Sequence, residues 1–278
     1  MRNQLLHIYR NTPFGRETFM QSEYFCRQLR LPLSVYIPNH PQFNLTFGLK
    51  ELVISLDQTY LSVPSTAEEH LTQVLESSPV VYRLFEPDAF KDTNLPEIPT
   101  DFSYMTCPHA ISERSERLGL GRVGIGHIGP AVSSIVKHAA FPVLIPSVVF
   151  LPWTSIVVLY GSSPVGVKTV RLGLKLAEQC GVPLRLCTSL AQGESREKCE
   201  SALEQDGVLE RVRQNANWDF WEEGKLKDLL FDIPRDSLVL IGAAAHGALK
   251  ELLFGSSLEF VQSMLPNTLL VIGAKWNG

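Results

Sequence analysis

The most informative segment of this 278-residue chain reads Ser237-Leu-Val-Leu-Ile-Gly242-Ala-Ala-Ala-His-Gly-Ala-Leu-Lys-Glu-Leu-Leu-Phe-Gly255-Ser256-Ser257. Its opening apolar run, which ends at Gly242, is typical of a buried parallel strand. After Ser257, apolar residues recur with helical spacing as far as Leu265, which predicts a helix. Free backbone N–H groups and the positive end of a helix dipole would meet where this helix begins, an arrangement that favours an anion such as phosphate.

The chain also contains an internal repeat, in which one predicted β-α-β unit occurs twice. Each unit has a strand running into a turn, then a helix, then a second strand. In the first unit these are residues 5–13, 18–30 and 31–37, and in the second they are residues 155–164, 167–180 and 182–188. The ends of the two halves also match, because residues 129–145 and 255–271 each predict a helix, a loop with proline and a last strand. Alternating strands and helices with short connections predict an α/β fold with parallel sheets.

The two halves differ in length. The span from Pro13 to Gly129 is about 25 residues longer than the span from Pro164 to Gly255, so an insertion is expected in the first half. We place it at residues 43–64 as added strand or irregular structure. Prolines at 146 and 152 mark the boundary. We therefore expect a degenerate domain over residues 1–148 and a second domain over residues 153–278.

The segment that begins at Gly242 resembles the nucleotide-binding motif of universal stress proteins: Gly, two residues, Gly, nine residues, then Gly and Ser or Thr. Gly242, Gly255 and Ser256 match this motif, whereas Ala245 stands where the second glycine is expected. The resemblance implies two tandem five-stranded parallel-sheet domains of the adenine nucleotide alpha hydrolase-like kind. They would pair through their last strands as an internal pseudo-dimer, with two distinct sheets rather than one continuous sheet.

The resemblance also implies a nucleotide site in the second half. Residues Gly242, Ala245, Gly255 and Ser256 would line the phosphates of ATP or AMP, with the Ser256 hydroxyl donating a hydrogen bond and Ser257 completing the helix start. Residues Gly161, Ser162 and Thr188 would flank the base and ribose. His246 either contacts a phosphate or is an exposed loop residue.

Two departures weaken this site. A Cβ at Ala245 narrows the approach of the backbone to a phosphate. The aspartate that usually ends the first strand of the family is absent, since Gly161 stands there in the second half and Arg10 in the first. The alternative is a strand–loop–helix joint that binds no ligand.

The first half offers a poorer site, because its counterpart of Ser256 is Pro130, which has neither hydroxyl nor N–H. Glycines crowd residues 119–129, and residues 124–129 spell GxGxxG, but no strand directly precedes them. A flexible hinge is the default interpretation of this segment, and an anion-binding loop that uses Arg122 and His127 is the alternative.

Composition excludes several classes of function. A net charge of −4 gives no reason to expect nucleic acid, and no apolar run is long enough to span a membrane. The N-terminus lacks a signal-peptide layout, and the five cysteines lack CxxC spacing. Reduced thiols in the cytoplasm are expected. The seven histidines lack metal-ligand spacing, and the aromatic cluster at residues 218–221 is better suited to a core or an interface than to base stacking.

Three functions remain. The first is a cytoplasmic stress or regulatory protein that binds an adenine nucleotide weakly and has no strong catalysis. The second is a structural interaction module that has lost its ligand. The third is a slow ATP hydrolase, which ranks last because no obvious general base or metal carboxylate lies in the motif. A homodimer of the whole chain is left open.

Overall fold

A computed structural model gives the fold. It describes residues 3–9, 15–37, 44–47, 52–55, 64–85, 102–107, 135–136, 139–147, 149–190, 195–222, 226–243 and 265–278. The expected helix over residues 258–265, the proline-rich residues 86–99 and the glycine-rich residues 119–129 lie almost wholly outside these ranges.

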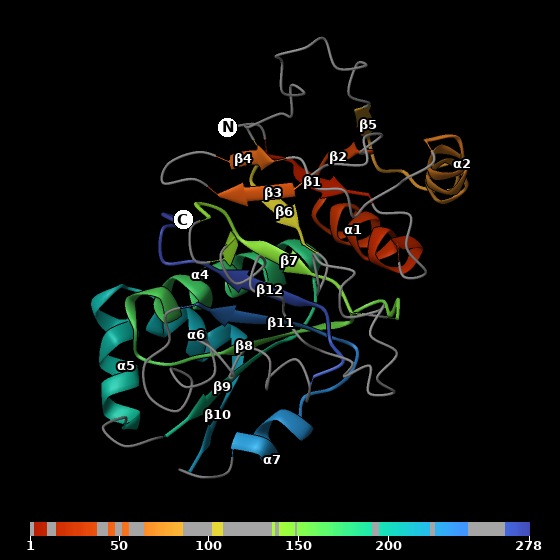
Figure 1. Ribbon diagram of the computed structural model, residues 1–278. Coiled ribbons are helices and arrows are strands. Elements are labelled where there is room, and N and C mark those ends of the chain that lie inside the picture. The colour runs from red at the N-terminus through yellow and green to blue at the C-terminus, as the bar shows by residue number, and fades with distance from the viewer. Residues whose placement is uncertain are drawn as a thin grey trace, which may run out of the picture.

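The described elements alternate between strands and helices, as an α/β fold requires (Figure 1). In the first half they are β1 (Leu5–Ile8), α1 (Gly15–Leu29), β2 (Leu33–Tyr36), β3 (Asn44–Phe47), β4 (Leu52–Ser55), α2 (Pro64–Leu75), β5 (Tyr82–Phe85), β6 (Tyr104–Thr106) and β7 (Val143–Ile145). In the second half they are β8 (Ser155–Leu159), α4 (Pro164–Cys180), β9 (Leu184–Ser189), α5 (Arg196–Gln205), α6 (Leu209–Asn215), β10 (Ala216–Trp221), α7 (Leu226–Phe231), β11 (Ser237–Gly242) and β12 (Leu269–Ile272).

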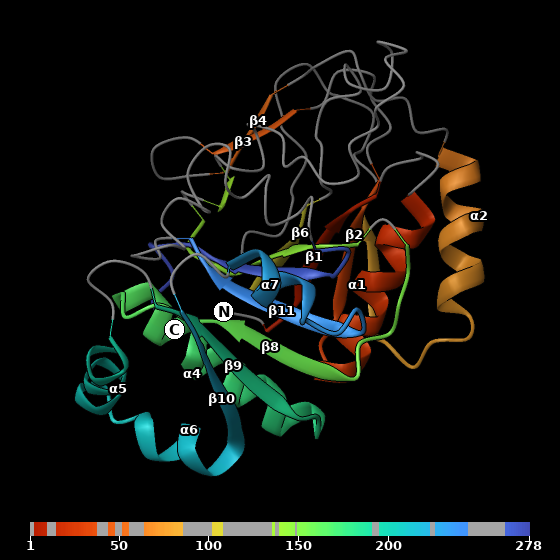
Figure 2. The ribbon, with the colours of Figure 1, turned by 90° about the horizontal axis from the view of Figure 1, so that it is seen from below.

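Ten of these strands form one sheet in the order β10-β9-β8-β11-β12-β7-β6-β1-β2-β5. The five strands of each half are mutually parallel, and only the central pair, β12 with β7, is antiparallel. Figure 2 shows the strands β8 to β10 at one end of the molecule and α1 with α2 at the other. The predicted fold class, two tandem five-stranded parallel halves joined as a pseudo-dimer, is confirmed.

One detail of that prediction is wrong. The two sets of strands are not distinct sheets, because the backbone hydrogen bonds between β7 and β12 make them one continuous sheet. Leu144 and Leu270, the counterparts in the two halves, lie directly opposite each other in this pair. Pairing the last strands removes two apolar edges from solvent, which explains why the halves fuse there.

The internal repeat is confirmed at the level of single residues. Leu5 N donates to Pro32 O at 3.1 Å, and Ile156 N donates to Pro183 O at 2.9 Å. At the other end of the same strands, Tyr9 N donates to Tyr36 O and Tyr160 N donates to Cys187 O, both at 2.9 Å. Every residue in the second set lies 151 positions after its counterpart, so the strands of β1-α1-β2 and β8-α4-β9 align in register without a gap.

The ends of the two long helices explain where the sequence prediction was inexact. α4 begins at Pro164, earlier than expected, because Ser163 caps it: Ser163 Oγ accepts a hydrogen bond from Gly166 N. Both helices close with the residue after them in the left-handed region, Arg30 (φ 52°) after α1 and Gly181 (φ 66°) after α4. The expected insertion also holds strands, since β3 and β4 form a separate two-stranded antiparallel sheet.

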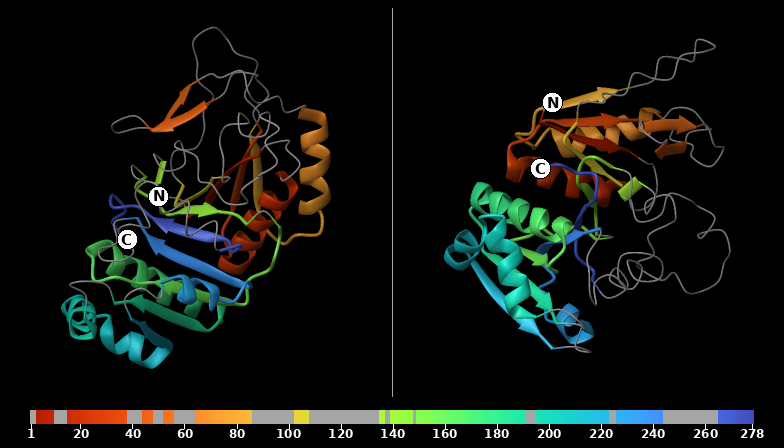
Figure 3. Two further views of the ribbon diagram at one scale, coloured as in Figure 1. Left: turned by 60° about the horizontal axis from the view of Figure 1, so that its bottom comes forward. Right: turned by 90° about the vertical axis from the view of Figure 1, so that its left-hand side faces the viewer.

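Helices and core residues cover both faces of the large sheet. One apolar cluster contains residues of α1, α2, α4, α5 and α6, and a second contains residues of α7 together with Ile135, Val136 and Ala139. α1 contacts α4 across the two halves, and α2 packs outside α1 (Figure 3). Within the described ranges, no helix combines the length and the apolarity that crossing a bilayer requires.

Candidate functional site

The carboxyl ends of β8 and β11 lie side by side, because these two strands pair in parallel (Figure 2). Tyr160 extends the β8 ladder by one residue, so Gly161 is the first residue beyond it. β11 ends at Gly242, and Ala243 N still donates to Ile272 O at 2.7 Å. The predicted residues Gly161, Ser162 and Gly242 therefore meet at one edge of the sheet, where open parallel sheets bind their ligands.

The turn between β8 and α4 is tight. Ser163 N donates to Gly161 O at 2.8 Å, and Gly166 N donates to Ser163 Oγ at 3.0 Å. A Cβ on Gly166 would lie 2.1 Å from Gly161 O, so only glycine fits at that position. This packing fixes the start of α4 next to the strand ends.

The packing of β11 against α4 by itself explains the glycine at position 242. A Cβ there would lie 3.0 Å from Thr169 Oγ1 and 3.1 Å from Val165 Cγ1. The absence of a side chain at Gly242 thus lets β11 approach α4 closely, a role that does not depend on a ligand.

Thr188 lies near the end of the neighbouring strand β9 and is fully buried. Its Oγ1 accepts a hydrogen bond from Trp218 Nε1 at 3.0 Å, which leaves the hydroxyl proton free to be donated elsewhere. Thr188 is thus tied to β10, the outermost strand of this half.

An aromatic cluster that the sequence did not assign to the site surrounds Thr188. Tyr160 and Trp218 meet edge to face at 5.8 Å, and Trp218 stacks on Phe220 at 4.7 Å. The Tyr160 hydroxyl donates to Cys199 O at 2.9 Å, and the Arg196 guanidinium lies 4.8 Å from the Phe220 ring centroid. Trp218 and Phe220 pack against the core, in agreement with the core interpretation of the aromatic cluster.

Two buried polar atoms near this edge have no hydrogen-bond partner, Ser189 Oγ and Trp221 Nε1. The two residues are direct neighbours in the ladder between β9 and β10. Both are at the carboxyl ends of their strands, so the edge carries unused polar groups. The sequence gives no signal for them, because it does not reveal which hydroxyl or indole lacks a partner.

The remaining predicted site residues, Ala245, His246, Gly255, Ser256 and Ser257, lie outside the described residues. Pro130, Arg122 and His127 of the first half do as well. The phosphate-binding part of the prediction is therefore untested by the geometry.

The Cys187 thiol near this edge is unreactive. Burial raises the pKa of the Cys187 thiol to about 12, so this thiol stays protonated at neutral pH and is a poor nucleophile. All five cysteines are free thiols. No cluster of His, Cys, Asp or Glu suited to a metal ion occurs in the described part of the chain.

Solved structures share this architecture. A universal stress protein from Archaeoglobus fulgidus DSM 4304 is 12% identical, with a TM-score of 0.63 over 98% of this chain and 99% of that one. A protein from Pseudomonas aeruginosa UCBPP-PA14, provisionally named a universal stress protein, is 13% identical, with a TM-score of 0.53 over 99% and 94%. A functionally unknown protein from Pseudomonas aeruginosa PAO1 is 14% identical, with a TM-score of 0.53 over 99% and 93%.

No protein-family model and no curated protein matches the chain. At these identities the structural likeness establishes the fold alone. The chain has the universal stress protein fold in its tandem form, as the motif in the second half predicted.

Proposed function

We propose that this chain is a cytoplasmic regulatory protein of the universal stress type that binds an adenine nucleotide weakly in its second half. The observation that carries the proposal is the pairing of β8 with β11, which brings the Gly161-Ser162 turn and the end of β11 at Gly242 to one edge. The capped start of α4 lies at that edge as well. Backbone N–H groups and a helix dipole there favour an anionic ligand.

The roles of the residues follow from their places. Ser162 and Thr188 would flank the base and ribose, with Thr188 donating the proton that its bond from Trp218 leaves free. The loop through Ala245 and His246 and the helix start Gly255-Ser256-Ser257 would hold the phosphates of ATP or AMP. We assign no strong catalysis, because none of the residues given a role in the proposed site is a carboxylate that could serve as a general base.

We also propose that the two halves are separate domains, residues 1–148 and 153–278, with the nucleotide in the second. The reason is the helix start, which reads Gly255-Ser256 in the second half and Gly129-Pro130 in the first. Proline cannot donate a backbone hydrogen bond to a phosphate.

One observation favours a second candidate, an interaction module without a ligand. Tyr160 is fully buried and its hydroxyl donates a hydrogen bond to Cys199 O, and Gly242 allows β11 to pack closely against α4. These contacts would hold the edge together even if no nucleotide bound.

Mass spectrometry of small molecules released from freshly purified full-length protein separates the two. The nucleotide-binding function predicts ATP or AMP in the released fraction, and a lower yield from Ser256→Ala. Ser201→Ala, an exposed serine on α5, serves as the matched control and should retain the wild-type yield. No released nucleotide from wild type, together with no binding of added ATP at millimolar concentration, would favour the interaction module.

A further inference from the structure

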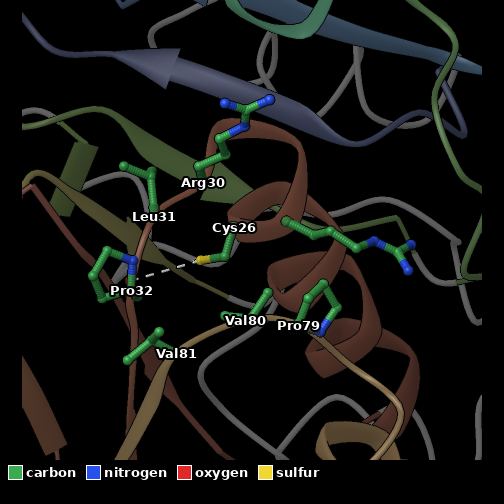
Figure 4. A pocket seen from close by; sticks show the side chains of 8 residues that line it. Cys26, Arg30, Leu31, Pro32, Pro79, Val80 and Val81 are labelled. Atoms are coloured by element: carbon green, nitrogen blue, oxygen red, sulfur yellow. Dashed lines mark hydrogen bonds between the residues drawn. The ribbon is translucent and has the colours of Figure 1, made fainter.

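A hollow of about 400 Å³ lies at the far end of the first half, where α1 ends and the chain turns toward β2. Leu31, Pro32, Val80 and Val81 supply apolar walls, and the buried Cys26 forms the floor. Figure 4 shows Arg30 on the opposite side of Cys26 from Val80 and Val81, with its guanidinium directed away from these two valines. Arg27 also lines the hollow, so two exposed cations border an apolar surface.

The wall beside Val80 is fixed to α1 by a buried carboxylate. Ser78 Oγ donates to Glu23 Oε1, and Val80 N donates to Ser78 Oγ at 3.2 Å. The same carboxylate lies 3.8 Å from Arg27 Nε, and the Arg27 guanidinium lies 5.2 Å from the Tyr24 ring centroid. The hollow therefore has a set shape, with Arg27 held along one side.

Arg30 has left-handed backbone geometry, with φ 52°. Arg30 N donates to Arg27 O and Leu31 N donates to Cys26 O, the closure that glycine favours after a helix. Residues other than glycine and asparagine adopt this geometry at a conformational cost, and such an outlier motivates a hypothesis of function for the side chain. No carboxylate among the described residues pairs with Arg30.

The second half lacks this combination. The counterpart of Arg30 is Gly181, and that of Arg27 is Glu178. Residues 213–215, which precede β10 as residues 79–81 precede β5, are Arg, Gln and Asn in place of Pro, Val and Val. Arg213 is already paired with Glu210 and Glu200. The corresponding described positions of the second half therefore carry neither an arginine at the helix end nor a wall of valines.

We propose that this hollow binds an amphipathic organic anion, a short hydrocarbon chain with a carboxylate or phosphate head. The head pairs with the guanidinium of Arg30, because a guanidinium presents a fork of donors that matches both anions. The chain lies on Leu31, Val80 and Val81. Binding is non-covalent, since burial holds the pKa of the Cys26 thiol well above its usual value and keeps it protonated.

This site is independent of the proposed nucleotide site. Leu31 and Pro32 precede β2, so the hollow lies at the amino end of a parallel strand, whereas the nucleotide edge lies at the carboxyl ends. Saturating ATP should therefore leave binding in the hollow unchanged.

The test is a titration of the full-length protein, followed by NMR or calorimetry, with octanoate, octyl phosphate, hexanoate and octanol. Octanoate or octyl phosphate binds, and the tighter of the two identifies the head group. Hexanoate, which is two methylenes shorter, binds about fifteenfold more weakly than octanoate, because each buried methylene strengthens binding about fourfold. Octanol, without charge, binds at least about tenfold more weakly than the better anion.

Two variants of Arg30 separate binding from folding. Arg30→Gln and Arg30→Gly both weaken binding of the better anion about tenfold. Only Arg30→Gly also relieves the backbone strain, so its melting temperature is equal to or higher than that of wild type. Arg211→Gln, an exposed arginine on α6, retains wild-type binding.

Three results would overturn the proposal. They are no binding of either anion at millimolar concentration, equal binding of octanol and the anions, and wild-type binding by both Arg30 variants. Competition by ATP would place the anion at the nucleotide edge instead and would also overturn it.

Discussion

Three polar side chains meet where α1 packs on β1 and β6 in the first half. The corresponding three positions of α4, β8 and β11 in the second half are apolar. Ser22 Oγ is 2.9 Å from His7 Nδ1 and 2.8 Å from Thr106 Oγ1, and all three residues are buried. In the second half, Val158 corresponds to His7, Gly173 to Ser22 and Leu240 to Thr106. One backbone register thus accommodates two different cores.

The comparison shows that each set of three residues is stable only when all three members are present. The polar set is stable because its members hydrogen-bond to one another, since a buried polar group without a partner is costly. The apolar set is stable because Gly173 leaves room for Val158. The two halves also differ outside their cores. The first half has the hollow that Arg27 and Arg30 help to line, and the second half has the Gly255-Ser256 motif.

Moving the serine of the first half into the second should have the largest effect. Gly173→Ser places a Cβ 2.5 Å from Val158 Cγ2 and buries a hydroxyl without the histidine and threonine that meet Ser22. We expect the free energy of unfolding to fall by about 3 kcal/mol, measured by urea denaturation. Lys175→Ser, on the exposed side of the same helix, should change it by no more than about 0.5 kcal/mol. Equal stability of Gly173→Ser and wild type would contradict the packing account.

Removing the serine from the first half should cost somewhat less. Ser22→Ala deletes the buried bonds to His7 and Thr106 without introducing a clash. We expect a loss of about 2 kcal/mol in the same assay. Ser77→Ala, which removes only an exposed hydroxyl, is the control. A loss no larger than that of the control would mean that the polar set contributes nothing to stability.

The halves should share one response to alkaline pH. Burial raises the pKa of Cys187 from 9.0 to about 12, and burial raises the pKa of its counterpart Tyr36 as well. The folded chain keeps the Cys187 proton longer than the unfolded chain does, so this stabilisation is complete below pH 9 and is lost as the pH rises toward 12. Cys187→Ala should flatten the fall of unfolding free energy between pH 9 and 12, by up to about 1.4 kcal/mol per pH unit. An unchanged slope would contradict this assignment.

The smallest effect is expected where the two helices end. Gly181→Arg copies Arg30 into the second half at a left-handed position, and a Cβ there meets nothing within 4 Å. The cost is therefore conformational alone, about 1 kcal/mol. Thermal unfolding should show a melting temperature about 2–4 °C lower than wild type. A loss much greater than this would mean that contacts, not backbone strain, distinguish the two helix ends.

The sequence predicted those features that depend on local patterns. Apolar runs such as residues 237–242 located the strands, and the repeat located its counterpart in the first half. The continuous sheet was missed, although pairing of residues 143–145 with residues 269–272 was expected and entails it. At the site, the positions of Gly161, Gly242 and Thr188 at one edge were predicted. The bond from Trp218 to Thr188 and the contact of Gly242 with Thr169 join residues far apart in the sequence, and no local pattern encodes them.

The central claim, a weak nucleotide site in the second half, is tested most directly by calorimetric titration of ATP into the wild-type chain and the double variant Gly161→Asp/Ala245→Gly. The variant restores a hydrogen-bonding carboxylate and a glycine in the phosphate loop. One regained hydrogen bond strengthens binding by about two- to tenfold. The account predicts weak binding by wild type and tighter binding by the double variant. Identical affinities, or no heat of binding from either protein, would contradict it.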